Sequence, residues 1–333
     1  MTDNDLVPRS RWPRRLILIA LVLGVAGLIT TLKNSHSLEP VKLPTLNGYD
    51  DIVQAGAMIQ GTWPNKGDLQ KASIDEIRPF VGANKASLDR ARVGLQRESM
   101  VHMDETHKGL GDHLNEINQI RSLNRLLMGE ALIFEADGQF DRSARTYGEV
   151  MELGQAVSQN GMMIDVTTGI AIQQQALTRI GNLSGRLSSI ESKSLIRQLE
   201  SIDQRRVTFE AVETCEDRWM QGAYPAYQRM MMRWSGVEQK SKADVRKTIV
   251  PIFDKKCRQL RFLEVQLAVH AFHADQKTRP KSVAELVPTY LPTVPLDPTS
   301  GEPLEYPANE AGELTDDLSQ IARPDGVIIK PQP

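Results

Sequence analysis

The first strong pattern along the chain is an uninterrupted apolar run near its N-terminus. The segment from Leu16 to Leu32 contains no charged residue, and Pro13 can open the helix because proline is tolerated in a first turn. The run predicts one membrane-spanning helix over residues 13–34, which anchors the chain in lipid. The alternative is a cleaved signal peptide, which usually has a shorter apolar region followed by a small-residue cleavage motif. No such motif follows here, so the sequence favours an uncleaved anchor.

Charges on the two sides of this segment predict its orientation. Only Lys33 follows it closely, whereas several arginines precede it: Arg9, Arg11, Arg14 and Arg15. Positively charged flanks stay in the cytoplasm. We therefore expect a cytoplasmic stub over residues 1–12, an anchor in the inner (cytoplasmic) membrane, and an extracytoplasmic remainder.

Beyond the anchor, apolar positions recur every three or four residues, which is the period of amphipathic helices. The fold class expected is mainly α: the transmembrane helix, a helical-hairpin ectodomain, and a small proline-rich C-terminal cap with two short strands. The expected boundaries are a tether with a weak helix over 35–72, the helical ectodomain over 73–275 and the cap over 276–333. Two long helices, 207–234 and 243–275, are expected around a turn at Ser235 and Gly236.

Composition agrees with a folded helical protein and limits its partners. The chain is 40% hydrophobic and 25% charged, and aromatic residues make up only 5%. The formal net charge is −2, and the first fifteen residues contribute positive charge, so the remainder is mildly acidic. Sequence-independent nucleic-acid binding relies on clustered positive charge, so we expect no nucleic-acid partner.

One predicted hairpin resembles a tetratricopeptide repeat over residues 127–153. Measured from Gly138, the small and large positions of that motif fall on Leu127, Ala131, Phe134, Phe140, Ser143, Tyr147 and Val150. Glu130 departs from the motif, and no second copy follows at a period of about 34 residues. An ordinary helical hairpin is the alternative interpretation.

The chain also resembles a group of uncharacterised planctomycete-type membrane proteins. They have an N-terminal anchor, an "EGD-x-x-x-A" hairpin and a "GIAI" helix, which correspond here to Ala136–Gly138 and Gly169–Ile172. This resemblance covers most of residues 110–306 and implies an anchored helical architecture of bacterial origin, and it implies no activity.

The C-terminal segment resembles the corresponding part of type II secretion major pseudopilins. The matching residues are Pro295, Asp297, Pro298, Gly301, Pro303 and Tyr306. Ser282 is expected to cap a short helix over 283–290, and strands are expected over 304–306 and 327–329. The anchor lies some 230 residues from this segment, whereas pseudopilins join the two directly.

Candidate metal ligands are few, and we expect no metal site or cofactor. His270 and His273 share a helix at a spacing that suits a metal, but no third ligand follows. The pseudopilin resemblance implies a calcium ion, and its candidate ligands here are Asp316, Asp317 and Asp325. These residues lack the regular spacing of oxygen ligands in a calcium loop. Residues 102–113 contain three histidines and are interpreted as a polar loop before a helix.

Two further features come from the pair of long helices. An aromatic and methionine stripe is expected to be core or, if exposed, a partner surface: Met220, Tyr224, Tyr227, Met231 and Trp234. Cys215 and Cys257 are each 21 residues from Gly236, so an antiparallel hairpin turning there would favour a disulfide.

The sequence contains no motif of a common hydrolase or nucleotide-binding enzyme: no G-x-S-x-G, no H-E-x-x-H and no glycine-rich phosphate loop. The leading hypothesis is therefore a membrane-tethered interaction or scaffold protein of the bacterial cell envelope, with a protein partner on the helical ectodomain and no assigned catalytic residue. The alternatives are a pseudopilin-like accessory of a secretion apparatus and an envelope enzyme without a recognisable motif.

Overall fold

The computed structural model describes residues 41–64, 72–225, 227–229, 231, 237–308, 312 and 314. This part of the chain is mainly helical, as the apolar period predicts. Two short 3₁₀ turns, η2 (Ser184–Arg186) and η3 (Val283–Leu286), follow longer helices. The α-helices are α2 (Gly48–Ala57), α3 (Ile74–Ala83), α4 (Lys85–Leu95), α5 (His107–Ala136), α6 (Phe140–Ala156), α7 (Met163–Leu183), α8 (Ser189–Gln204), α9 (Phe209–Ala223) and α11 (Val237–Gln276).

Helices α5 and α6 form the hairpin that the repeat-like pattern predicts. The turn is at Gly138, whose φ of 71° is a left-handed conformation that glycine adopts without a Cβ penalty. Ser143 Oγ donates a hydrogen bond to the Ala131 carbonyl at 2.9 Å, so the two helices approach closely at this pair of small residues. The larger side chains beside them, Leu127, Tyr147 and Val150, are fully buried.

A second hairpin, α7 and α8, stacks on the first in the same direction. Along α6 and α8, Ser188 Oγ donates to Asp141, Gln198 donates to the Gly148 carbonyl, and Arg205 pairs with Glu152. These partners are 47, 50 and 53 residues apart in sequence. The chain therefore repeats a hairpin at a period of about fifty residues, which explains why no copy is visible at 34.

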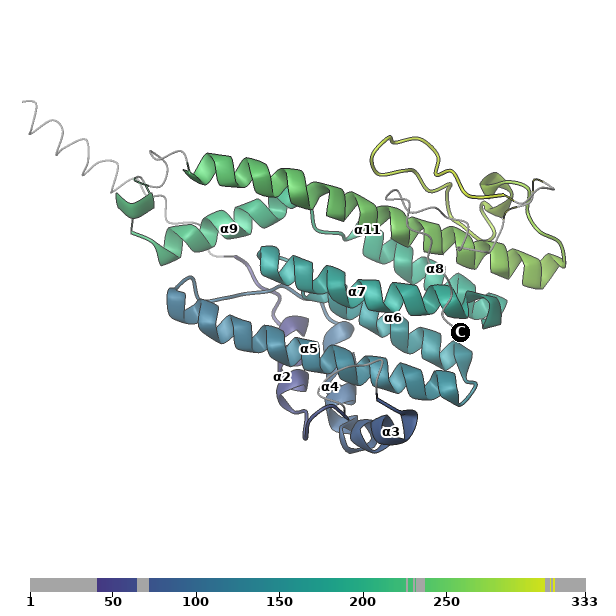
Figure 1. Cartoon of the computed structure of the whole chain (residues 1–333), viewed down its shortest axis with the longest axis horizontal. Helices are drawn as coiled ribbons and strands as arrows, with labels where there is room; N and C mark the ends of the chain where they lie inside the picture. The colour runs from purple at the N-terminus through teal and green to yellow at the C-terminus, as the bar shows by residue number, and fades with distance from the viewer. Residues whose placement is uncertain are drawn as a thin grey trace, which may run out of the picture.

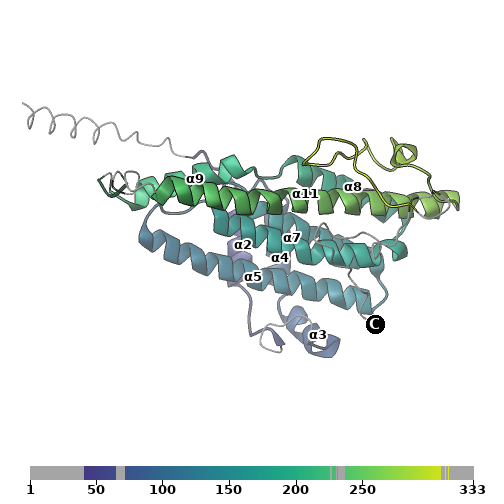
Figure 2. The same cartoon turned by 45° about the horizontal axis from the view of Figure 1, so that its top comes forward.

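An earlier hairpin and a later helix extend this stack at both ends. Helices α2 and α4 are antiparallel, and a Cβ on Gly48 would lie only 2.4 Å from the Gly94 carbonyl oxygen. At the other end, α11 covers both α7 and α8, because Gln266 donates to the Gly181 carbonyl at 3.1 Å and Arg261 pairs with Asp203 at 2.7 Å. Helices α5, α7 and α11 consequently lie side by side along one face of the molecule (Figures 1 and 2).

The N-terminal part of the stack includes a segment that we expected to belong to the tether. Tyr49 and Ile52 of α2 are at most 1% exposed and belong to the main hydrophobic core. The helical domain therefore begins before residue 73. The predicted anchor, residues 13–34, lies outside the described residues, and within the described ranges no helix has both the length and the apolar content needed to cross a membrane.

The turn between α9 and α11 lies earlier in the chain than the sequence pattern predicts. Tyr224 takes an extended conformation (φ −117°, ψ 134°) before Pro225, so α9 ends at Ala223 and does not continue to residue 234. Lys242 pairs with Asp217 and Arg246 pairs with Glu210, which places the midpoint of the hairpin near residue 229. Pro251, in contrast, lies inside the continuous helix α11.

This shifted midpoint separates the two cysteines, so the predicted disulfide is not formed. Cys215 Sγ lies 3.7 Å from Asn160 Oδ1, and Cys257 Sγ lies 3.3 Å from Asp203 Oδ1. With the turn near residue 229, the position opposite Cys215 is about residue 243. Cys257 is fourteen residues further along the helix, roughly 21 Å away at 1.5 Å per residue.

The predicted stripe of aromatic and methionine residues is not the face of one helix. Met220 and Tyr224 are half-buried at the end of α9, where Tyr224 packs edge-on against Trp219 with ring centroids 5.9 Å apart. After the break, Tyr227 is 56% exposed and Met231 is 67% exposed. Trp234 lies outside the described residues.

The proline-rich segment folds back as a cap on α11. Asp297 Oδ1 accepts hydrogen bonds from the backbone N–H groups of Thr299 and Ser300, and its carboxylate pairs with Arg258 at 2.6 Å. The expected helix over 283–290 is only the 3₁₀ turn η3, and residues 304–306 form no strand. Isolated bridges at Leu296–Pro303 and Ala308–Leu314 are present instead, and residues 327–329 lie outside the described part.

Candidate functional site

The parallel helices α5 and α7 meet along a seam of polar contacts. His113 Nε2 lies 2.7 Å from Asp165 Oδ1 at the start of the seam. Further along, Arg121 donates to Thr168 Oγ1 at 3.4 Å, and Asn124 Nδ2 donates to Gln175 Oε1 at 3.3 Å. The seam therefore has a buried end, occupied by His113, and an open middle, occupied by an arginine and two amides.

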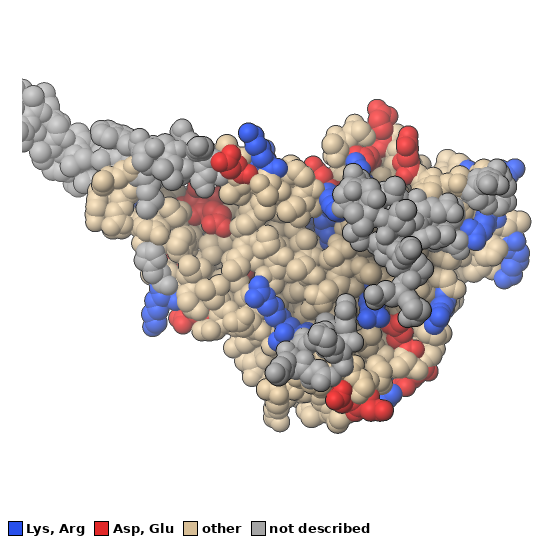
Figure 3. Space-filling view, viewed as in Figure 1, with Lys and Arg blue, Asp and Glu red and all other residues tan. Residues whose placement is uncertain are grey.

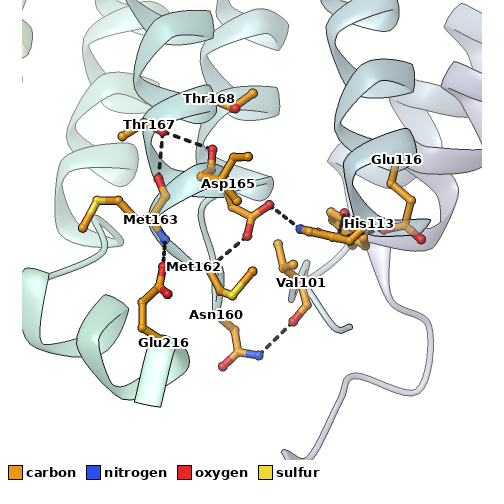
Figure 4. A network of polar contacts seen from close by, with 12 residues as sticks. Val101, His113, Glu116, Asn160, Met162, Met163, Asp165, Thr167, Thr168 and Glu216 are labelled. Carbon is orange, nitrogen blue, oxygen red and sulfur yellow. Dashed lines mark hydrogen bonds and ion pairs between the residues drawn. The ribbon is translucent and has the colours of Figure 1, made fainter. Parts of the chain in front are cut away.

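His113 is the centre of the buried end. Thr106 caps α5 by accepting from the Gly109 N–H, so the helix begins at His107 and places His113 toward α7. The imidazole lies between two carboxylates, with Nδ1 3.0 Å from Glu116 Oε2 (Figure 4). Tyr49 of α2 donates its hydroxyl to the same Glu116 oxygen at 3.0 Å. Three helices distant in sequence are thus joined through one ring.

Asp165 is held in place from the other side by its own helix. Its second oxygen accepts from the Met162 N–H at 2.9 Å at the N-terminus of α7, where helix N–H groups lack intrahelical partners. The neighbouring Met163 N–H donates to Glu216 of α9 at 2.8 Å (Figure 4). The start of α7 therefore links α5 with α9.

Two carboxylates around one ring determine its charge. Burial lowers the pKa of His113, but the hydrogen bonds that the ring donates to Asp165 and Glu116, together with the negative charges of these carboxylates, outweigh this effect and raise the pKa to about 9. The ring is therefore an imidazolium at neutral pH. Burial raises the pKa of Glu116, but its hydrogen bonds with His113 and Tyr49, together with the positive charge of the ring, leave that pKa below its ordinary value.

The buried end of the seam fits a structural role better than a catalytic one. Tyr49, His113 and Asp165 are each at most 2% exposed, so a substrate has no direct access to the ring. The sequence interpretation placed His113 in a loop, and its partners Asp165 and Tyr49 were not recognised. Asp165 is 52 residues away, and no local pattern indicates a partner at that distance.

The open middle of the seam is a groove of about 310 Å³ between α5 and α7. This volume is at the lower end of the range of about 300–1,000 Å³ for ligand sites, and the groove is open to solvent. Its lining combines guanidinium, amide and hydroxyl groups with few apolar side chains: Arg121, Asn124, Arg125, Thr167, Thr168, Ala171, Ile172 and Gln175. The face in Figure 3 carries basic side chains over α5 and α7, with acidic side chains nearer its edges.

Comparisons with protein-family models, curated proteins and solved structures found no match for this chain.

A second groove, between α4, α6 and α8, differs from the first in its charge balance. Its arginines are paired: Arg92 with Glu149 at 2.9 Å, Arg97 with Asp51 at 2.5 Å and Arg205 with Glu152 at 3.0 Å. Because these guanidinium groups already have carboxylate partners, the second groove has less capacity to attract an anionic ligand.

The predicted metal candidates do not come together. His273 Nδ1 lies 3.3 Å from the Thr278 carbonyl, while Asp275 accepts from Ser189, Lys193 and Tyr290. The His270 ring instead packs close to Gly185, 3.3 Å from where a Cβ on that glycine would lie. Within the described ranges, no three His, Cys, Asp or Glu side chains are arranged to hold a metal ion. Asp316, Asp317 and Asp325 lie outside these ranges.

Proposed function

We propose that this chain is a membrane-tethered interaction protein of the bacterial cell envelope, with the groove between α5 and α7 as the contact site for a protein partner. The observation that carries this proposal is the stack of parallel hairpins, which presents a continuous face formed by α5, α7 and α11. Stacked helical hairpins expose extended surfaces of this kind to their partners. The buried contacts of His113 with Asp165 and Tyr49 hold the helices of this face together, and the ring is not accessible to a substrate.

The proposal also includes the membrane anchor that the sequence predicts. The apolar run over 13–34 would anchor the chain in lipid, with the N-terminus in the cytoplasm and the stack on the other side. Cysteines introduced at Ser10 and at the exposed Ser282 test this orientation in a chain without Cys215 and Cys257. In outer-permeabilised cells, an impermeant thiol reagent should label position 282 and leave position 10 unlabelled; the opposite pattern would reverse the orientation.

A pull-down from native membranes with the full chain as bait tests the interaction role. We expect the wild-type chain to recover a specific partner that Arg121→Glu recovers poorly, because the substitution reverses a charge in the groove. Arg197→Glu is the matched control, since Arg197 is exposed on α8 and does not line the groove. Recovery of nothing specific in repeated trials would contradict the proposal.

A second candidate is a pseudopilin-like accessory of a secretion apparatus. It is favoured by the cap, in which Asp297 and Gly301 shape a turn that packs against the long helix α11. The same pull-down distinguishes the two functions, because this candidate requires secretion-apparatus subunits among the recovered proteins.

A further inference from the structure

Two guanidinium groups in the groove lack carboxylate partners. Arg121 and Arg125 are one helical turn apart on α5, and neither forms an ion pair with any residue in the described ranges. Both donate to hydroxyl groups, Arg121 to that of Thr168 and Arg125 to that of Ser122. Like charges four residues apart destabilise a helix slightly, so an anion between them would be favoured.

A buried acceptor in the same groove also lacks a partner. Asn124 is 4% exposed, and its Nδ2 is used by the hydrogen bond to Gln175. Among the residues that the structure describes, its Oδ1 has no hydrogen-bond partner. A buried unsatisfied acceptor costs free energy, about 1–3 kcal/mol in general, and a ligand N–H would remove that cost. The groove thus offers positive charge for an anion and an acceptor for a donor.

An extended peptide with acidic side chains carries both complementary groups. We propose that the groove binds an acidic, extended segment of a partner protein, an inference that rests on the proposed interaction function. Arg121 and Arg125 pair with its carboxylates, and Asn124 Oδ1 accepts one of its backbone N–H groups. The open groove of about 310 Å³ has room for a short stretch of such a segment, with the rest lying along the face of α5 and α7.

The lining favours a peptide over a nucleic acid. Single-stranded nucleic acids are held by stacking of bases on aromatic side chains, and none of the lining residues is aromatic. Two cations would also neutralise few phosphates. Amide and hydroxyl groups, in contrast, suit the regular donors and acceptors of a peptide backbone.

Fluorescence anisotropy with the full chain in detergent micelles tests this inference. The probe is fluorescein-labelled hexaglutamate with an amidated C-terminus, and the comparison probes are hexaglutamine with a free C-terminal carboxylate and hexathymidylate. We expect saturable binding of hexaglutamate to the wild-type chain. The affinity should fall about tenfold in Arg121→Gln and about tenfold in Arg125→Gln, because each variant loses a charge-assisted hydrogen bond. Arg197→Gln should bind like the wild-type chain.

Asn124→Ala tests the backbone contact separately. It should weaken binding of hexaglutamate, and the loss should disappear with an N-methylated hexaglutamate, which has no N–H to donate. Circular dichroism of each variant checks that it is folded. Arg125→Lys keeps the positive charge but loses the planar guanidinium group, so it should retain part of the affinity for hexaglutamate. This variant can replace Arg125→Gln in the test if the neutral variant does not fold.

Several outcomes would overturn the inference. Hexaglutamate that does not bind, or that binds equally to a folded Arg121→Gln/Arg125→Gln chain, would exclude an acidic segment in the groove. Equal or tighter binding of hexathymidylate would indicate nucleic acid instead, and preferential binding of hexaglutamine would indicate a terminal carboxylate. Binding that begins only after deletion of residues 315–333 would show that the chain's own acidic tail, and not a partner, occupies the groove.

The pull-down distinguishes failure of the acidic-segment inference from failure of the proposed interaction function. A partner that is recovered equally by the wild-type chain and by Arg121→Glu/Arg125→Glu would leave the interaction function standing and overturn the acidic-segment inference. The absence of any specific partner would contradict the interaction function itself.

Discussion

Replacing His113 with glutamine tests whether the buried imidazolium holds α2, α5 and α7 together. Glutamine can keep a donor near Asp165 but carries no charge. The pKa of His113 is raised from 6.5 to about 9, which corresponds to roughly 3 kcal/mol of stability at about 1.4 kcal/mol per unit. Because the folded pKa lies above the unfolded one, this stability is fully present below pH 6.5 and is lost as the pH rises through 9.

The assay is urea unfolding followed by circular dichroism between pH 6 and pH 10, in detergent for the full chain. The difference in unfolding free energy between wild type and His113→Gln should fall by about 3 kcal/mol across this range. Other groups titrate in the same window, including Lys256 and Glu264, but they are present in both proteins and cancel in the difference. The carboxylates and hydroxyl that face the ring are those of Asp165, Glu116 and Tyr49.

The result that would refute this reasoning is a difference that stays constant to within about 0.5 kcal/mol over the whole range. His273→Gln is the matched control, because His273 is exposed and its ring contacts a backbone carbonyl. A double-mutant cycle with Asp165→Asn should give a coupling free energy of about 1 kcal/mol or more, since the two side chains are in direct contact.

Three further predictions concern other buried positions. Lys256 is 8% exposed, its Nζ has no partner in the described part of the chain, and burial lowers its pKa to about 7. Lys256→Met should therefore stabilise the fold by about 2–4 kcal/mol, most at pH 7 and below, in the same unfolding assay. Burial raises the pKa of Glu264 to about 8, so the gain in stability from Glu264→Gln should grow from pH 4.5 to pH 8 and then level off, and a gain that does not change with pH would contradict this. A Cβ on Gly169 would lie 2.3 Å from the Gly154 carbonyl oxygen, so Gly169→Ala should lower the melting temperature and cost about 1–3 kcal/mol, whereas Gly111→Ala, with nothing within 4 Å, should be neutral or stabilising.

Local signals in the sequence predicted the helices well and their packing poorly. Gly138 marked a turn that the structure confirms, because the φ of 71° is accessible to glycine with little strain. The end of α9 was missed because apolar spacing continued past Tyr224, while the backbone restriction before Pro225 was stronger.

The candidate site was less accessible to sequence reasoning because its contacts are distant. Arg121 and Thr168 are 47 residues apart, and Asn124 and Gln175 are 51 apart. Each pair meets only because two hairpins stack in the same direction. The repeat behind this stacking was not predicted, because a tetratricopeptide repeat has a period of about 34 residues and these hairpins recur at about fifty.

The long helix α11 has two different environments along its length. Residues from Leu260 to Ala271 pack in the core, whereas residues 244–248 are exposed and the neighbouring contacts to α9 are ionic, between Arg246 and Glu210 and between Lys242 and Asp217. Ionic contacts between exposed groups weaken as salt screens them over about 8 Å at physiological ionic strength, while apolar packing does not. The first turns of α11 should therefore open locally, with faster amide exchange at higher salt, while the last turns stay closed. The N-terminal part of α11 would then detach from α9 in a salt-dependent way, while its C-terminal part stays packed and the stacked hairpins remain folded.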